Sequence, residues 1–172
     1  MLSEKIAEKL GKKELKKYAY LDELTGLPNR RFLLEILPEL SEKKVGEKEH
    51  SLGILQIEIY QLKMIKYSLG HKFAERLLKA IAQRLNSHLP PEGILAKIGL
   101  DEFAILLKKI TDLESVIEYI EKIQDDFSDP LHLGENDIFV TKKNRNHRLT
   151  IRGKNQTISY FQASDFRQRS RY

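Results

Sequence analysis

Two apolar segments separated by a short polar break constrain the fold of this 172-residue chain more than any other feature. Residues 94–98 and 103–107 are rich in Ile, Leu and Ala, and the break at residues 99–102 contains a glycine and two adjacent acids. Apolar runs on both sides of such a break predict a β-hairpin with two carboxylates at its tip. The second run also predicts a buried central strand, and binding sites are often built at the ends of such strands. An ordinary polar turn is the alternative.

The other apolar residues show the spacing of strands in some segments and of helices in others. Residues 52–59 predict a mostly buried strand, in which Glu58 needs a partner, a metal or a position at the strand end. A second hairpin is predicted at residues 130–141. Helices are predicted at residues 1–20, 30–40 (ended by Pro38), 61–69, 73–89 and 113–127. This order predicts an α+β fold with a mainly antiparallel central sheet covered by helices.

Composition excludes several classes of protein. Charged residues make up 32% of the chain and hydrophobic residues 41%, as in soluble globular domains. The absence of cysteine excludes disulfides, thiolate metal sites and a cysteine nucleophile, and it agrees with a cytoplasmic location. No apolar run approaches the roughly 20 residues of a membrane span, so we expect no membrane segment.

The net charge of +5 is concentrated at the end of the chain. Residues 142–172 hold nine Lys or Arg side chains and one acid, a net charge of +8. The other residues hold 21 basic and 24 acidic side chains, a net charge of −3. Binding of nucleic acid would therefore rest on this basic tail alone, and we do not expect it.

A second motif lies near the start of the predicted domain. Residues 22–31 read Asp-Glu-Leu-Thr-Gly-Leu-Pro-Asn-Arg-Arg, which predicts a turn followed by a helix that begins near Asn29 or Arg30. Together with the hairpin, this motif resembles the GGDEF family, the diguanylate cyclases that condense two GTP molecules into cyclic di-GMP. The family hairpin reads Gly-Gly-Asp/Glu-Glu-Phe, and residues 99–103 read Gly-Leu-Asp-Glu-Phe.

The resemblance implies a domain organisation. It covers roughly residues 18–141 and implies an N-terminal stalk helix at 1–20, a GGDEF-like domain at 21–141 with a nucleotidyl-cyclase-like sheet, and a divergent tail at 142–172. In such proteins the stalk commonly links the domain to an upstream sensor. We therefore expect a homodimer, or further signalling domains in a longer protein.

The resemblance also implies a metal site. The family's Mg²⁺ ligands fall on the side chain of Glu58, the carbonyl of Ile59 and the side chain of Asp101. The second acid of the hairpin, which helps to deprotonate the attacking 3′-hydroxyl in the family, falls on Glu102. Glu58 replaces an Asp, and this difference in length is expected to weaken a Mg²⁺ site, since the ion demands near-ideal octahedral geometry.

The nucleotide-binding positions depart further from the family pattern. Lys63 matches a phosphate-contacting Lys, whereas the two guanine-reading positions hold Lys66 in place of Asn and Glu75 in place of Asp. Gly99 and Leu100 match the two hairpin glycines, and Leu100 adds a side chain where the family leaves space for phosphates. Other family acids are replaced by Tyr60 and Tyr67, and a family Gly by Ala74.

These departures favour one of three hypotheses. The favoured one is a degenerate GGDEF domain of cyclic di-GMP signalling that is inactive or weak and serves as a regulatory, dimerisation or nucleotide-binding module. The alternative is an active diguanylate cyclase that binds GTP with Mg²⁺. The third is nucleic-acid binding through the basic tail.

The tail departs from the family after residue 141. The family continues with a central strand and a further helix, whereas residues 142–148 read Lys-Lys-Asn-Arg-Asn-His-Arg. Loss of that strand would leave a sheet edge unpaired. The tail is either a genuine variant or the product of a shifted reading frame, and a shifted frame predicts an irregular or poorly packed segment.

Overall fold

The computed structural model describes residues 19–41, 51–59, 62–110, 112–140, 147–152 and 157–160. Its elements in chain order are α2 (Arg30–Ser41), β1 (Ser51–Glu58), α3 (Leu62–Leu69), α4 (His71–Ser87), β2 (Ile94–Lys97), β3 (Glu102–Ile110), α5 (Leu113–Asp126), β4 (Leu131–Leu133), β5 (Asn136–Ile138), β6 (His147–Arg152) and β7 (Thr157–Tyr160).

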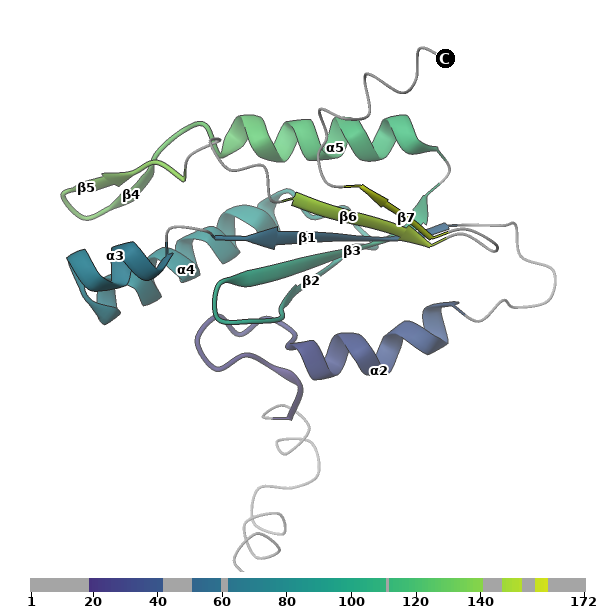
Figure 1. Cartoon of the computed structure of the whole chain (residues 1–172), viewed down its shortest axis with the longest axis horizontal. Helices are drawn as coiled ribbons and strands as arrows, with labels where there is room; N and C mark the ends of the chain where they lie inside the picture. Colours follow the sequence, from purple (N-terminus) through teal and green to yellow (C-terminus); the bar gives the residue numbers. More distant parts are fainter. Residues whose placement is uncertain are drawn as a thin grey trace, which may run out of the picture.

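A five-stranded sheet forms the centre of the molecule, with strand order β2-β3-β1-β6-β7 (Figure 1). All of its neighbouring strands are antiparallel. A separate two-stranded hairpin is formed by β4 and β5. The predicted α+β architecture and both predicted hairpins are therefore confirmed.

The two faces of the sheet bury different sets of side chains. Leu55 and Ile57 of β1 and Phe103 and Ile105 of β3 belong to a core that is closed by α4 and α5. On the other face, Ala104 and Leu106 pack with residues of α2. The alternation along β3 follows from strand geometry, in which successive side chains point to opposite faces. Figure 1 shows α2 and α5 on opposite sides of the sheet.

Helix α2 runs past the proline that was predicted to end it. Pro38 lies inside the helix, which continues to Ser41. Pro38 is exposed, whereas Leu37 and Leu40 pack against the sheet. Burial of these leucines outweighs the hydrogen bond that a proline removes from a helix interior.

The opening motif forms a turn that is tied to the sheet. The Asp22 carboxylate accepts hydrogen bonds from the Thr25 backbone N–H at 2.9 Å and from its hydroxyl at 2.6 Å. The Asn29 side chain accepts from the Phe32 N–H at 3.0 Å, as expected for a residue that caps the start of α2. The backbone N–H of Lys97 donates to the carbonyl of Pro28 at 2.8 Å, which joins this turn to β2.

Two segments of the predicted tail, residues 147–152 and 157–160, form strands. Strand β6 pairs with β1 from Leu52 opposite Arg152 to Ile57 opposite His147, and β7 pairs with β6. Segment 147–152 contains β-branched residues, which favour strands, and it meets the backbone groups of β1 that would otherwise form an open edge. Strand β6 thus lies inside the sheet, between β1 and β7. Residues 1–18, which include most of the predicted stalk helix, and the remainder of 142–172 fall outside the described residues.

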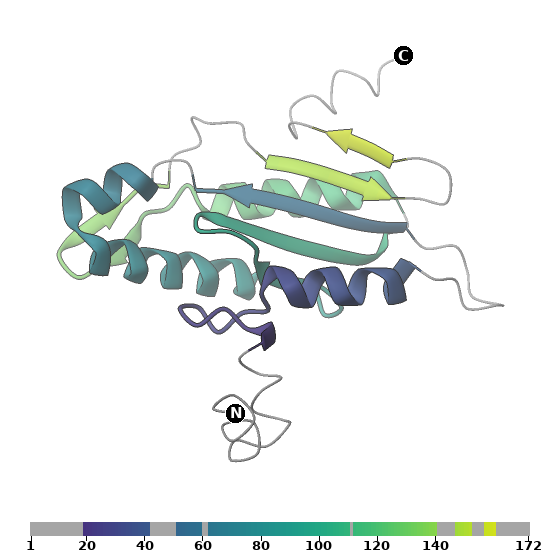
Figure 2. The same cartoon turned by 60° about the horizontal axis from the view of Figure 1, so that its bottom comes forward.

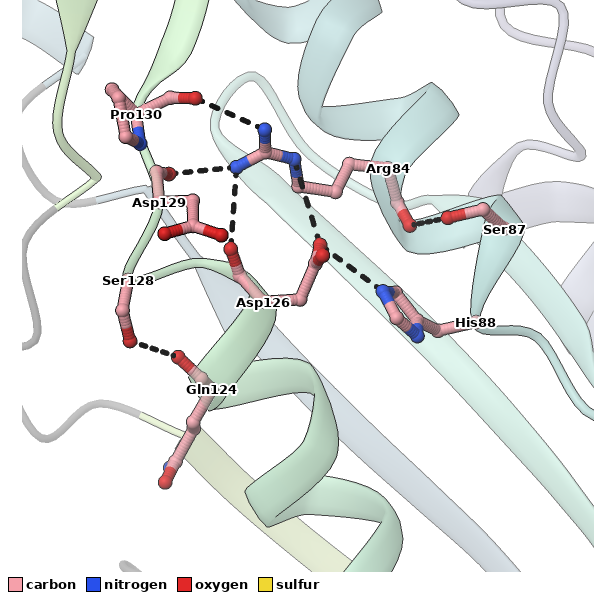
Figure 3. A network of polar contacts seen from close by, with 8 residues as sticks. All are labelled: Arg84, Ser87, His88, Gln124, Asp126, Ser128, Asp129 and Pro130. Atoms are coloured by element: carbon pink, nitrogen blue, oxygen red, sulfur yellow. Dashed lines mark hydrogen bonds and ion pairs between the residues drawn. The ribbon is translucent and has the colours of Figure 1, made fainter.

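A polar network joins the C-terminal ends of α4 and α5 (Figure 3). Arg84 donates to the backbone carbonyls of Asp126, Asp129 and Pro130 at 3.4, 2.8 and 3.1 Å. The Asp126 carboxylate lies 3.5 Å from Arg84 Nε and 3.1 Å from His88 Nε2. Because the last carbonyls of a helix have no partner within it, Arg84 stabilises the end of α5 and the chain that leads into β4.

None of the described helices is long and apolar enough to cross a lipid bilayer.

Tyr119 of α5 provides a test of the core. Its hydroxyl is buried without a hydrogen-bond partner among the described residues, and burial raises its pKa from 10.0 to about 12. We expect Tyr119→Phe to raise the free energy of unfolding by about 1 kcal/mol at neutral pH, since a buried unpaired hydroxyl is destabilising.

Above pH 10 the parent should lose stability, because the unfolded chain releases the tyrosine proton while the folded chain keeps it until about pH 12. The Tyr119→Phe variant should lose less stability over the same pH range. Urea unfolding at pH 7 and at several values above 10 measures both effects. A variant less stable than the parent at pH 7 would contradict the account.

Candidate functional site

Three acidic residues lie at one end of the central sheet. Glu58 is the last residue of β1 and lies opposite Glu102, the first residue of β3. The backbone N–H of Ile59 donates to the carbonyl of Asp101 at 2.8 Å. The backbone register therefore brings Glu58, Asp101 and Glu102 together. Glu58 is exposed at the strand end, which explains how an acid is tolerated in this apolar strand.

The hairpin tip is closed by hydrogen bonds to one carbonyl. The N–H groups of Ile98 and Gly99 donate to the carbonyl of Glu102 at 3.0 and 3.3 Å. A Cβ atom at Gly99 would lie 2.8 Å from Oε2 of Glu102, so a side chain here would displace the Glu102 carboxylate, which folds back over the glycine. The Leu100 side chain is 89% exposed, which rules out burial against the neighbouring helices.

A buried lysine lies beneath this tip. Lys97 is only 5% exposed, and its ammonium group donates to the carbonyl of Gly99. The same ammonium lies 5.0 Å from the centre of the Phe103 ring, within range of a cation–π interaction. Burial lowers the pKa of Lys97, and the carboxylates of Asp22, Asp101 and Glu102 partly oppose this shift.

Lys97 was not among the site residues predicted from the sequence. The available signal was a single charged residue within the apolar run 94–98, two positions before the hairpin glycine. A charge in a buried strand implies a buried partner, and here the partner is the backbone of the hairpin itself.

The donor atoms at this sheet end fit a hard cation. Mg²⁺ is commonly held by one or two carboxylates and otherwise keeps water, and Glu58 and Asp101 supply two carboxylates from adjacent strand ends. The carbonyl of Ile59 already accepts a hydrogen bond from the Leu62 N–H at 3.2 Å. Within the part of the chain that the structure describes, no group of three or more His, Cys, Asp or Glu side chains could hold a metal. A two-carboxylate site remains compatible with these residues.

Helices α3 and α4 carry the remaining predicted site residues. Lys63 and Lys66 are exposed on α3. Gly70, at φ 87°, forms the sharp turn between the two helices. On α4, Oε1 of Glu75 lies 3.3 Å from Nδ1 of His71, so this carboxylate already has a partner on its own helix. Both views show α3 and the β2–β3 hairpin tip towards the same end of the molecule (Figures 1 and 2).

Lys97 makes stability depend on pH in a defined window. Burial lowers the pKa of Lys97 in the folded chain below its ordinary value of 10.5. Between the folded-state pKa and 10.5, the unfolded chain therefore binds more protons at this side chain than the folded chain does. The free energy of unfolding should therefore rise with pH through that window, up to about 10.5, and Lys97→Met should remove this rise. Chemical unfolding across alkaline pH measures the slope. The exposed Lys79→Met is the matched control, and an equal loss of slope in both variants would refute the assignment.

Known proteins with similar sequences come from one domain family. The family described as "Diguanylate cyclase, GGDEF domain" matches residues 19–157, which extends past the predicted boundary at 141. The cyclic di-GMP phosphodiesterase PdeB of Shewanella oneidensis is 35% identical over 116 residues, which cover 67% of this chain and 13% of PdeB. The diguanylate cyclase DgcP of Escherichia coli is 31% identical over 123 residues, which cover 70% of this chain and 35% of DgcP.

A solved structure has the same fold. The GGDEF domain of TpbB from Pseudomonas aeruginosa superposes with a TM-score of 0.63 at 28% identity, covering 76% of this chain and 72% of that one. The chain thus spans a small part of its curated relatives and most of an isolated GGDEF domain. Because the family match covers well over half of the sequence, the chain belongs to the GGDEF domain family.

Proposed function

We propose that this chain is a GGDEF domain of cyclic di-GMP signalling that does not cyclise GTP and instead regulates a longer protein. The proposal rests on the residues at the two guanine-reading positions, which are Lys66 and Glu75. Lys66 can only donate hydrogen bonds, whereas an Asn can both donate and accept at the edge of a base. Glu75 is held by His71 at 3.3 Å. Lys66 and Glu75 together therefore do not match the hydrogen-bonding groups at the edge of guanine.

The hairpin supports the same conclusion. Leu100 places an exposed apolar side chain at the tip, where the family has a second glycine close to the phosphates. The Glu102 carboxylate lies against Gly99, and in this position it is poorly placed to accept a proton from a substrate hydroxyl. General-base catalysis needs the base within hydrogen-bond reach of that proton.

Some capacity to hold a nucleotide is retained. Glu58 and Asp101 are the residues that would hold Mg²⁺, which would neutralise phosphate charge when bound. Lys63 on α3 would supply a further positive charge to the phosphates. These three side chains would contact only the metal and the phosphates, so the module would hold a Mg²⁺–triphosphate without selecting guanine. An active cyclase is the second candidate, favoured by the retention of Asp101 and Glu102.

The cyclase assay separates the two candidates. Purified protein incubated with GTP and Mg²⁺ should form no more cyclic di-GMP than the double variant Glu58→Ala, Asp101→Ala, because the base-reading contacts that orient two substrates are absent. Chromatography with mass detection measures the product. Turnover clearly above that of the double variant would establish the active cyclase and reject our proposal.

Nucleotide selectivity is a separate test. We expect ATP and GTP to compete equally for any Mg²⁺-dependent site, since Lys63 and the carboxylates contact only phosphate and metal. Two base-reading hydrogen bonds would each contribute about 0.5–1.5 kcal/mol, so a guanine-reading site would prefer GTP by roughly 5- to 150-fold. Competition titration against a fluorescent triphosphate distinguishes these outcomes, with Lys63→Ala as the control that should weaken both nucleotides.

A further inference from the structure

The chain projects from the molecule at the turn between α3 and α4. Gly70 forms this turn at φ 87°, and every residue from Lys66 to Lys72 is exposed. A helix that lies flat on a core buries a residue every three or four positions, so an uninterrupted exposed run of this length marks a projecting corner. Figures 1 and 2 show α3 beyond the ends of the central strands, at one end of the molecule.

This corner combines exposed apolar side chains with lysines. The side chains of Met64, Tyr67 and Leu69 are 66%, 89% and 45% exposed. Three exposed lysines lie among them in the sequence. Grouped exposed apolar residues commonly mark interaction surfaces in soluble proteins. We define the α3–α4 corner as Lys63, Met64, Lys66, Tyr67, Leu69 and Lys72.

The two helices that form the corner carry almost only positive charge. Helix α3 contains no acid, and Glu75 is the one acid of the described segment 62–87. Oε1 of Glu75 lies 3.3 Å from Nδ1 of His71, so this carboxylate has a partner on its own helix. The acids of the sheet end belong to the strands and their hairpin. A negatively charged surface that meets the corner end-on would therefore face lysines.

We propose that the α3–α4 corner docks on the surface of an anionic lipid bilayer. Tyrosine favours the boundary between water and hydrocarbon, and lysine stems can lie along apolar surface while their ammonium groups reach lipid phosphates. Lysine is depleted at protein–protein interfaces, whereas lysines around exposed apolar side chains are typical of helices that lie on anionic membranes. The chemistry of the corner therefore favours a lipid surface over another protein.

The proposal goes beyond the regulatory function argued above, because docking needs no nucleotide and assigns a lipid surface as the partner. On the bilayer, Lys63 and Lys66 would face lipid phosphates instead of a nucleotide. Docking and nucleotide binding would therefore exclude each other at α3.

A single tryptophan tests the contact directly, because the chain contains none. We compare Tyr67→Trp with the matched control Leu34→Trp, whose α2 position is 56% exposed. Vesicles that contain phosphatidylglycerol should shift the emission of Tyr67→Trp to shorter wavelength, and brominated lipid in them should quench it. The control should show neither effect, and neutral phosphatidylcholine vesicles should leave both variants unchanged.

Two results of this fluorescence measurement would overturn the proposal. One is an emission of Tyr67→Trp that anionic vesicles leave unchanged, or that they shift no more than the emission of Leu34→Trp. The other is a shift that grows with protein concentration in the absence of vesicles, since this would show contact with a second protein molecule.

Charge reversal provides the second measurement. Each lysine near an anionic membrane surface strengthens binding about fivefold, so the double variant Lys66→Glu, Lys72→Glu should bind anionic vesicles roughly 25-fold more weakly or worse. The control Arg30→Glu, Lys122→Glu makes the same charge change at exposed positions of α2 and α5 and should keep most of the binding. Co-sedimentation with vesicles measures the affinity, which should fall as salt is raised.

The basic residues 142–172 offer a competing route to an anionic surface. Binding through them alone would leave the variant Lys66→Glu, Lys72→Glu attached to vesicles as tightly as the unaltered chain. That result, or an equal loss of binding in the Arg30→Glu, Lys122→Glu control, would refute docking through the α3–α4 corner.

Discussion

The antiparallel pairing of β1 with β3 is the constraint on which the site depends. Its register sets Glu58 opposite Glu102, and the hydrogen bond from Ile59 to Asp101 continues the ladder past the strand ends. The same strands carry buried core residues, so hydrophobic burial fixes the register and the register fixes the backbone positions of the acids. A slip by one residue would turn Phe103 out of the core, where it is now fully buried. The acidic end of the sheet is therefore as well defined as the core.

Below that end, Lys97 and Gly99 shape the hairpin. The lysine ammonium holds the carbonyl of Gly99, and the missing side chain of Gly99 leaves room for Glu102. A buried cation next to several carboxylates lowers the repulsion among them, at the cost of removing the cation from water. This arrangement places a positive charge beneath the acidic hairpin that is supplied by the chain itself.

The fold class and both hairpins could be predicted from the sequence, because period-two and helical spacing report which residues are buried. The assignment of Glu58 and Asp101 to one metal site came only from the resemblance to the GGDEF family. Several features required the tertiary structure. Pro38 lies within α2 because burial of Leu37 and Leu40 outweighs local propensity, and residues 147–152 form a strand because β1 offers an edge that pairs with them. The burial of Lys97, the folding of Glu102 over Gly99 and the exposure of Leu100 were likewise decided by packing, since each depends on contacts between segments that spacing along the chain does not report.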